Sequence, residues 1–307
     1  MSNSEGFVQI AAGPSLHYSI IGEGPEPVII PAESWLAADL EPLAPGRTLV
    51  FYDQRGRGAS GALAGDGGSL PWTAYEMDDL EAVRRHFGFE QVSLVGWSYL
   101  GGVTALYAAE HPARVKRLLM MCPISPRSEA PYHDEPRIEE KSNARIDPTA
   151  LKRLEEMREA GLDTRDPVTY CREHQKVYLP RQMGNLHALT NRRSDPCRFE
   201  NEWPRNLIEH FRRTSPQGSW DWRPRMAVVQ APVLVLHGEE DLIPVESSRD
   251  WAAAFPNARI LVIKGSGHYP HLEAPGAFLA AAQRFLAGDW PEGAEVVSQS
   301  PDGQSDL

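Results

Sequence analysis

The sequence has no long apolar run. None of its stretches approaches the roughly 18 consecutive apolar residues that a membrane-spanning helix needs. The first residues also lack the basic stretch and apolar core of a secretory signal. We therefore expect no membrane partner and no targeting segment.

Positive charge is scarce. The chain has 31 Lys and Arg against 42 Asp and Glu, a formal net charge of −11 over 307 residues. Proteins that hold the nucleic-acid backbone neutralise its phosphates with Lys and Arg. This balance predicts no nucleic-acid partner.

Cysteine is also rare. Cys122, Cys171 and Cys197 lie far apart and form no C-x-x-C pair. Neither a zinc ribbon nor a disulfide framework is therefore predicted. Such cysteine usage is typical of a reducing compartment, and we expect a cytoplasmic protein. The alternative is a secreted protein whose signal has already been removed.

Metal and nucleotide motifs are missing as well. The histidines show no H-E-x-x-H spacing, and no glycine run forms a G-x-G-x-x-G turn or a lysine-bearing P-loop after a strand. The sequence therefore predicts no metal and no cofactor.

The chain does contain short β-branched runs that alternate with helical patterns. A helix is predicted near residues 72–88, where apolar side chains recur at close to helical spacing. Further helices are expected at 247–255 and 277–288. The predicted strands are residues 16–21, 27–30, 48–52, 92–95, 115–120, 231–238 and 258–265. This alternation indicates an α/β fold with a mostly parallel central sheet flanked by helices.

The pattern divides the chain into four parts. Residues 1–125 and 227–288 carry the strands and are predicted to form the two parts of one core. Between them, residues 126–226 lose the strand signals and show charged helical stretches broken by Pro and Gly, which predicts an inserted helical cap. Residues 289–307 are polar and are predicted to be a disordered tail.

One segment has the pattern of a nucleophile elbow. An apolar strand runs into Gly96-Trp97-Ser98-Tyr99, and an Ala-rich helix follows. A sharp strand-to-helix turn of this kind exposes the serine hydroxyl, and the N–H of Tyr99 would face a developing oxyanion. The motif departs from G-x-S-x-G because Leu100 replaces the second glycine. The alternative is that Ser98 only caps a buried helix.

A serine nucleophile needs a base and an acid that orients this base. The segment after residues 231–238 contains Asp241, and the segment after residues 258–265 contains His268. In the α/β order Ser, acid, His, these two are the predicted partners of Ser98. His271 is the competing base, and Glu239 and Glu240 are the competing acids.

These motifs resemble those of the α/β-hydrolase superfamily over residues 7–288, and within it the proline iminopeptidase-like enzymes. The segment Asp53 to Ser60 resembles the family's D-x-R-G-x-G-x-S loop, whose role is mainly structural. The family usually carries His-Gly after its third strand, whereas this chain reads Pro31-Ala32-Glu33. By position, the second oxyanion donor would be the N–H of Glu33 or of Ala32, since Pro31 has no N–H.

The same resemblance suggests substrate-binding residues. Iminopeptidases hold the substrate's free amine with acidic side chains, and Glu33, Glu200 or Glu202 could serve here. In a cap so rich in charges, we favour a solvated or Arg-paired surface role for each of these carboxylates. The substrate pocket could be lined by Trp97, Trp203, Trp220 and Trp222, although the cap tryptophans could equally pack the cap onto the core.

The sequence thus predicts a serine hydrolase that cleaves an ester or amide bond of a small substrate. An iminopeptidase-like aminopeptidase acting on short peptides, a carboxylesterase or lactonase, and a non-catalytic small-molecule-binding homologue are the competing readings. The oligomeric state is left open.

Overall fold

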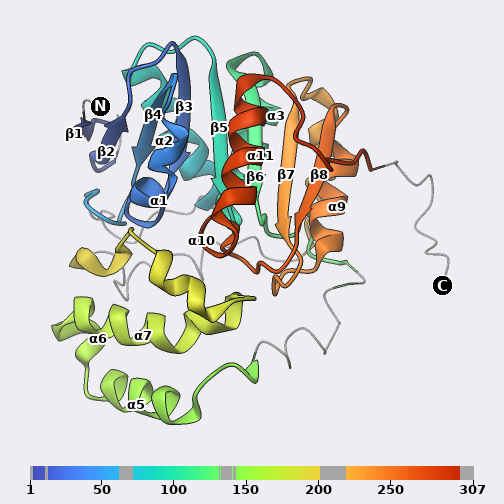
Figure 1. Cartoon of the computed structure of the whole chain (residues 1–307). Coiled ribbons are helices and arrows are strands. Elements are labelled where there is room, and N and C mark those ends of the chain that lie inside the picture. Colours follow the sequence, from blue (N-terminus) through green and yellow to red (C-terminus); the bar gives the residue numbers. More distant parts are fainter. Residues whose placement is uncertain are drawn as a thin grey trace, which may run out of the picture.

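Eight strands form a single sheet in the order β1-β2-β4-β3-β5-β6-β7-β8 (Figure 1). The computed structural model describes residues 3–10, 13–61, 72–130, 132, 140, 143–200 and 219–297. The strands β1 and β2 pair antiparallel, as do β2 and β4, whereas all other neighbours are parallel. The strands are β1 Asn3–Val8, β2 Leu16–Ile21, β3 Glu26–Pro31, β4 Arg47–Tyr52, β5 Val92–Trp97, β6 Val115–Met121, β7 Val233–Gly238 and β8 Ala258–Ile263. The predicted α/β fold with a mostly parallel sheet is confirmed.

Helices cover both faces of this sheet. Central strand β5 is buried along its whole length, and successive side chains enter opposite cores. Val95 packs in the core that contains Phe285, and Leu94 in the core that contains Trp251. The core helices are α1 Glu33–Leu40, η1 Glu41–Leu43, α2 Trp72–His86, α3 Tyr99–Glu110, η2 Pro112–Arg114, η7 Arg223–Val228, α9 Val245–Ala254, α10 Pro270–Glu273 and α11 Pro275–Ala287. Helices α1 and α11 therefore cover one face, and α2, α3 and α9 the other.

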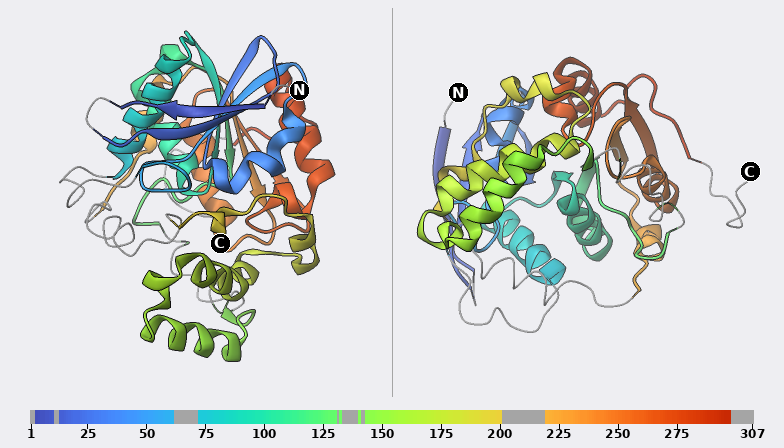
Figure 2. Two further views of the ribbon diagram at one scale, coloured as in Figure 1. Left: turned by 90° about the vertical axis from the view of Figure 1, so that its left-hand side faces the viewer. Right: turned by 90° about the horizontal axis from the view of Figure 1, so that it is seen from below.

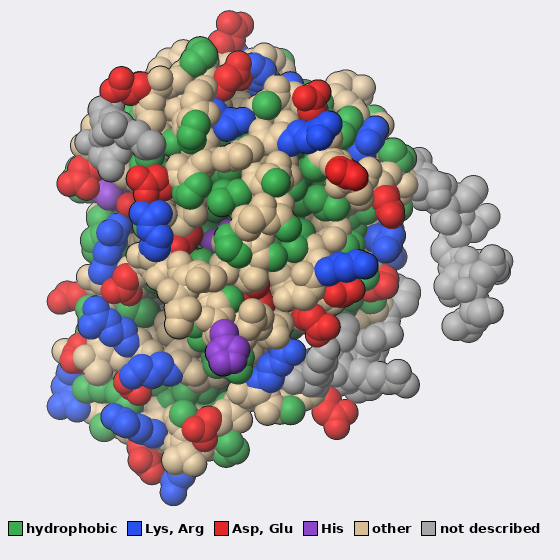
Figure 3. All heavy atoms as spheres, in the orientation of Figure 1, with side chains coloured by type: hydrophobic (Ala, Val, Ile, Leu, Met, Phe, Trp, Pro, Cys, Tyr) green, Lys and Arg blue, Asp and Glu red, His purple; other side chains and the backbone are tan. Residues whose placement is uncertain are grey.

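The cap lies beyond the carboxyl ends of the parallel strands (Figure 1). Its described helices are α5 Pro148–Glu159, α6 Leu162–Arg165, α7 Pro167–Gln182, η4 Leu186–Asn191 and η5 Pro196–Arg198. They enclose a small core of their own around Leu154, Tyr170 and Val177. Seen from below in Figure 2, these helices lie over the β1 side of the sheet, and α3 remains visible beside them. Acidic and basic side chains are interspersed over the face of the molecule in Figure 3.

A disulfide joins Cys171 in α7 to Cys197 in η5. The expectation of no disulfide was wrong. The two cysteines are 26 residues apart, and only the fold of the cap brings their Cα atoms to 5.5 Å. Since disulfides persist in oxidising environments, the cysteine argument for a reducing compartment is lost, and the cytoplasmic location stays a prediction. Among the described helices, none is long and apolar enough to cross a membrane.

The two ends of the described chain differ from expectation. Strand β1 was not among the predicted strands, because its sequence NSEGFV is polar and Phe7 points largely to solvent. Residues 289–297 are also more ordered than predicted. Ile260 and Glu295 exchange backbone hydrogen bonds of 2.9 and 2.8 Å, so the chain after α11 pairs with the edge of β8.

Candidate active site

Ser98 occupies a sharp turn between β5 and α3. Its backbone has φ 56° and ψ −128°, a conformation that non-glycine residues rarely adopt. The residue is partly exposed, and its hydroxyl makes no capping hydrogen bond to the helix that follows. This geometry is that of an elbow, and it gives no support to the alternative that Ser98 only caps α3.

Close backbone packing explains the glycines around this turn. A Cβ on Gly96 would lie 2.3 Å from Thr104 Oγ1 and 2.6 Å from the Leu100 carbonyl oxygen. A Cβ on Gly101 would lie 2.9 Å from Pro123 Cβ. Leu100 itself is buried in the core. The turn tolerates Leu100 at the last position of the G-x-S-x-G motif because Pro123 approaches the backbone one residue later, at Gly101.

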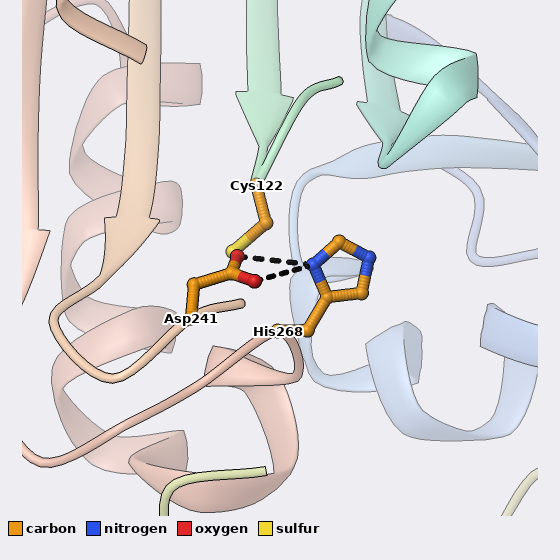
Figure 4. Close-up of side chains that lie close together, drawn as sticks. All are labelled: Cys122, Asp241 and His268. Carbon is orange, nitrogen blue, oxygen red and sulfur yellow. Dashed lines mark hydrogen bonds and ion pairs between the residues drawn. The ribbon is translucent and has the colours of Figure 1, made fainter. Parts of the chain in front are cut away.

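His268 and Asp241 are hydrogen-bonded. The Nδ1 atom of His268 lies 3.0 and 3.1 Å from the two carboxylate oxygens of Asp241, and both side chains are buried (Figure 4). Asp241 Oδ1 also accepts the Ile243 N–H at 3.0 Å. Burial alone would raise the pKa of Asp241, but the charge of His268 and these hydrogen bonds together lower it. The carboxylate therefore stays ionised and favours the proton on Nδ1.

The competing residues have other environments. Glu239 is exposed and accepts the Gly265 N–H at 3.1 Å, and neither it nor Glu240 bonds the imidazole of His268 in the described contacts. Burial, together with the charges of Arg192 and His268, lowers the pKa of His271 to about 3. An imidazole with such a pKa is a poor proton acceptor at neutral pH.

Trp97 connects the elbow to the histidine loop. Its indole Nε1 donates to the His268 carbonyl at 3.0 Å, and its ring centroid lies 5.4 Å from that of His268. Trp97 is only 8% exposed, which leaves little surface for the substrate contact that the sequence suggested. No hydrogen bond joins the Ser98 hydroxyl to His268 in the described contacts. The contact between the elbow and His268 is made by Trp97, the residue before Ser98.

Glu273 holds the histidine loop to the cap. Its carboxylate accepts the N–H groups of Gly184 and Asn185 at 2.7 and 2.8 Å, just after α7 ends. It also accepts those of Gly267 and Tyr269 at 2.9 and 3.2 Å, on either side of His268. The residue was not predicted, although a glutamate in the first turn of α10 is a recognisable anchor for N–H groups.

The start of α1 lies at the expected oxyanion position. Ala32 has a left-handed backbone with φ 71° and directs the chain from β3 into the helix. The Ser34 N–H donates to Asp53 Oδ1 at 3.0 Å, whose other oxygen accepts the Ala59 N–H at 3.1 Å. Asp53 thus ties its own loop to α1, in line with the structural role expected of it. The described contacts give the N–H of Glu33 no acceptor.

The side chain of Glu33 is engaged by the cap. Its two oxygens accept hydrogen bonds from Arg198 Nη2 at 3.0 and 2.7 Å. This is the Arg-paired role that we favoured for Glu33 over a contact with a substrate amine. Sequence patterns gave no indication of Arg198 as the partner.

Among the remaining candidates for substrate contacts, the structure describes Trp220, Trp222 and Glu200. Trp222 is 9% exposed and packs near Trp220 and Trp251, with ring centroids 5.8 and 6.3 Å away. It therefore packs the cap junction onto the core. Glu200 is exposed. The predictions for Glu202 and Trp203 fall outside the described residues.

Cys122 lies beside the acid and the base at the end of β6 (Figure 4). One donor atom each from Cys122, Asp241 and His268 falls within 4.8 Å of the others, a spacing that a metal ion could use. Metal binding by cysteine requires the thiolate. Burial, reinforced by the charge of Asp241, raises the pKa of Cys122 and keeps it a thiol. The donor set therefore fits a hydrogen-bonded acid and base better than a metal centre.

A second polar network lies behind the elbow. The Tyr99 hydroxyl accepts from Gln54 Nε2 at 2.9 Å and donates to Glu76 Oε1 at 3.4 Å. Burial, with the nearby charge of Asp79, raises the pKa of Glu76 to about 8. This buried carboxylic acid was not predicted, because a Glu in a helix with several other charged residues gives no sign of burial.

These features define a class of protein. The family described as alpha/beta hydrolase fold matches residues 30–275, and the chain belongs to this family of enzymes, which confirms the resemblance predicted from the motifs. Three similar proteins span different activities. A non-heme haloperoxidase of Rhodococcus erythropolis is 24% identical over 85% of this chain and 92% of its own length. A proline iminopeptidase of Heyndrickxia coagulans is 21% identical over 92% of this chain and 98% of its own. The structure of an esterase from Exiguobacterium antarcticum superimposes with a TM-score of 0.64 at 16% identity, covering 92% of this chain and 99% of that one.

Proposed function

We propose that this chain is a serine hydrolase that cleaves an ester or amide bond of a small substrate through an acyl-enzyme. The observation that carries the proposal is the hydrogen bond between His268 Nδ1 and Asp241, together with a strained and partly exposed Ser98 that directly follows Trp97, a residue in contact with His268. In this arrangement Ser98 is the nucleophile, His268 the base and Asp241 the residue that orients the base.

The reaction follows from these roles. As the Ser98 oxygen attacks the carbonyl carbon, His268 Nε2 takes the hydroxyl proton, and the charge of Asp241 stabilises the imidazolium. The N–H groups of Tyr99 and Glu33, at the starts of α3 and α1, donate to the oxyanion. His268 then protonates the leaving group and activates the water that releases the acyl group. The hydroxyl of Ser98 turns toward Nε2 when substrate binds, since catalytic hydrogen bonds often tighten only in the complex.

The pairing of Glu33 with Arg198 favours an ester over a peptide as substrate. An aminopeptidase needs an acceptor for the free amine, and Glu33, one of the three carboxylates considered for this role, is bound by Arg198. We therefore rank a carboxylesterase or lactonase before an iminopeptidase. Iminopeptidase activity remains the second candidate, because a relative that aligns over 92% of this chain carries that name.

Labelling with a fluorophosphonate probe tests the proposal. The parent protein should be labelled and Ser98→Ala should not. Ser93→Ala, which changes a buried serine of the strand that leads into Ser98, should be labelled like the parent. Labelling of Ser98→Ala at the parental rate would refute the nucleophile, and no labelling of the parent would favour the non-catalytic reading. Turnover of short nitrophenyl esters against a prolyl arylamide then separates esterase from iminopeptidase, because only the peptidase requires a free amine.

A further inference from the structure

A short segment of the cap is bound to both ends of helix α1. We call residues 193–198 the clasp. At the C-terminal end of α1, the Arg193 N–H donates to Asp39 Oδ1 at 2.7 Å, and its guanidinium lies 2.5 Å from Glu41. At the N-terminal end, Arg198 binds Glu33 through both carboxylate oxygens.

The clasp is itself anchored in the cap. Cys197, next to Arg198, is bonded to Cys171 of α7. Asp195 caps the same turn by accepting the Cys197 N–H at 3.0 Å. The position of the Arg198 backbone is therefore set by α7.

Between these polar contacts the clasp and α1 border an open groove. The groove has a volume of about 550 Å³ and is lined by residues of α1, β1, β2 and the clasp, with Glu33 and Arg198 among them. The polar contacts at the two ends of α1 therefore contribute to the attachment of the clasp.

Glu33 depends on this attachment. Burial, followed by the charge of Asp53, raises its pKa, and Arg198 opposes both effects. Ser19 adds one hydrogen bond at 3.3 Å. Without the Arg198 guanidinium, the Glu33 carboxylate would remain buried beside Asp53. An oxygen of Asp53 also accepts the N–H of Ser34, the residue that follows Glu33.

We propose that Arg198 is a positioning residue for the reaction: by holding the Glu33 side chain, it fixes the orientation of the Glu33 N–H toward the oxyanion. This inference rests on the proposed function, because it assigns that N–H to the oxyanion hole. It makes the cap a working part of the catalytic site.

The test measures kcat and KM on a short-chain nitrophenyl ester. Removing an oxyanion donor altogether lowers kcat by about 10²–10³-fold, so its misplacement in Arg198→Met should lower kcat by about tenfold, with KM within about twofold. Arg198→Lys should recover most of this loss, because an ammonium still pairs with Glu33. Arg165→Met is the matched control: Arg165 lies in the cap, binds the Ala160 carbonyl and should leave kcat unchanged.

Two further variants exclude a purely structural role. Glu33→Gln combined with Arg198→Met should be no slower than the slower single variant, since both act through one contact. The double variant Cys171→Ser, Cys197→Ser retains the Arg198 side chain but removes the bond between the clasp and α7, and it should lower kcat in the same way. This variant serves as the test if Arg198→Met does not fold.

The outcomes separate the two proposals. Parental kcat in Arg198→Met, or a loss confined to KM, or losses that simply add in the double variant, would overturn the positioning role. If instead the parent shows no Ser98-dependent labelling or turnover, the proposed function itself fails, whatever Arg198 does.

Discussion

Asp241→Asn is the sharpest test of the catalytic arrangement. In the structure both carboxylate oxygens of Asp241 face His268 Nδ1 at 3.0 and 3.1 Å, and Oδ1 also accepts the Ile243 N–H. An asparagine would keep its oxygen toward Ile243 and turn its NH₂ toward the imidazole. Because two donors cannot face each other, the ring proton would move to Nε2, which could then no longer accept the proton of Ser98.

The expected loss is about 10⁴-fold in kcat, or about 5 kcal/mol of transition-state stabilisation, with little change in KM. Initial rates on a nitrophenyl ester at pH 7.5–8, alongside circular dichroism to confirm folding, measure it. Glu239→Gln and Glu240→Gln are matched controls from the same loop and should retain parental kcat. A folded Asp241→Asn with parental activity, or an equal loss in Glu240→Gln, would show that Asp241 is not the orienting acid.

Three other predictions concern stability. The pKa of Glu76 is raised from its usual 4.5 to about 8, so the folded state binds this proton more tightly than the unfolded state. The unfolding free energy should therefore fall by up to about 5 kcal/mol as pH rises from 4.5 through 8. Urea titrations should show that the unfolding free energy of Glu76→Gln depends less on pH than that of the parent. Gly96→Ala places a Cβ against backbone and should cost about 1–3 kcal/mol in urea unfolding, whereas Gly276→Ala, where a Cβ meets nothing within 4 Å, should be neutral; equal midpoints would contradict this. Replacing Cys171 and Cys197 by serine removes a cross-link spanning 26 residues and should lower stability by about 3.5 kcal/mol, a value that a calorimetric scan without any shift in Tm would refute.

Sequence patterns were sufficient for features with a local signature. The alternation of strands and helices predicted the parallel sheet, and the glycines around Ser98 predicted the turn because close packing leaves room for no side chain there. Asp241 and His268 each follow a strand that the sequence makes evident, and parallel strands bring their carboxyl ends to one edge of the sheet.

Features that depend on tertiary contacts had no such signature. The partners Cys171 and Cys197, and likewise Glu33 and Arg198, are distant in sequence and meet only through the folding of the cap. An Arg-paired role was among the expectations for Glu33, but its partner could not be named, because a sequence shows the charge of a residue and not its ion pair. The burial of Glu76 was equally hidden, since its helix carries charged residues on several sides.

The four N–H groups gathered by Glu273 suggest how the cap can diversify. Gly184 and Asn185, which follow α7 within the cap, are joined to the loop of His268 through this carboxylate, and the His268 N–H also donates to the Gln182 carbonyl at 2.7 Å. Helices α5 and α6 precede α7 in the chain and share no hydrogen bond with that junction in the described contacts. Evolution, or a protein engineer, could therefore exchange these outer helices while keeping the segment of the cap that holds the loop of His268.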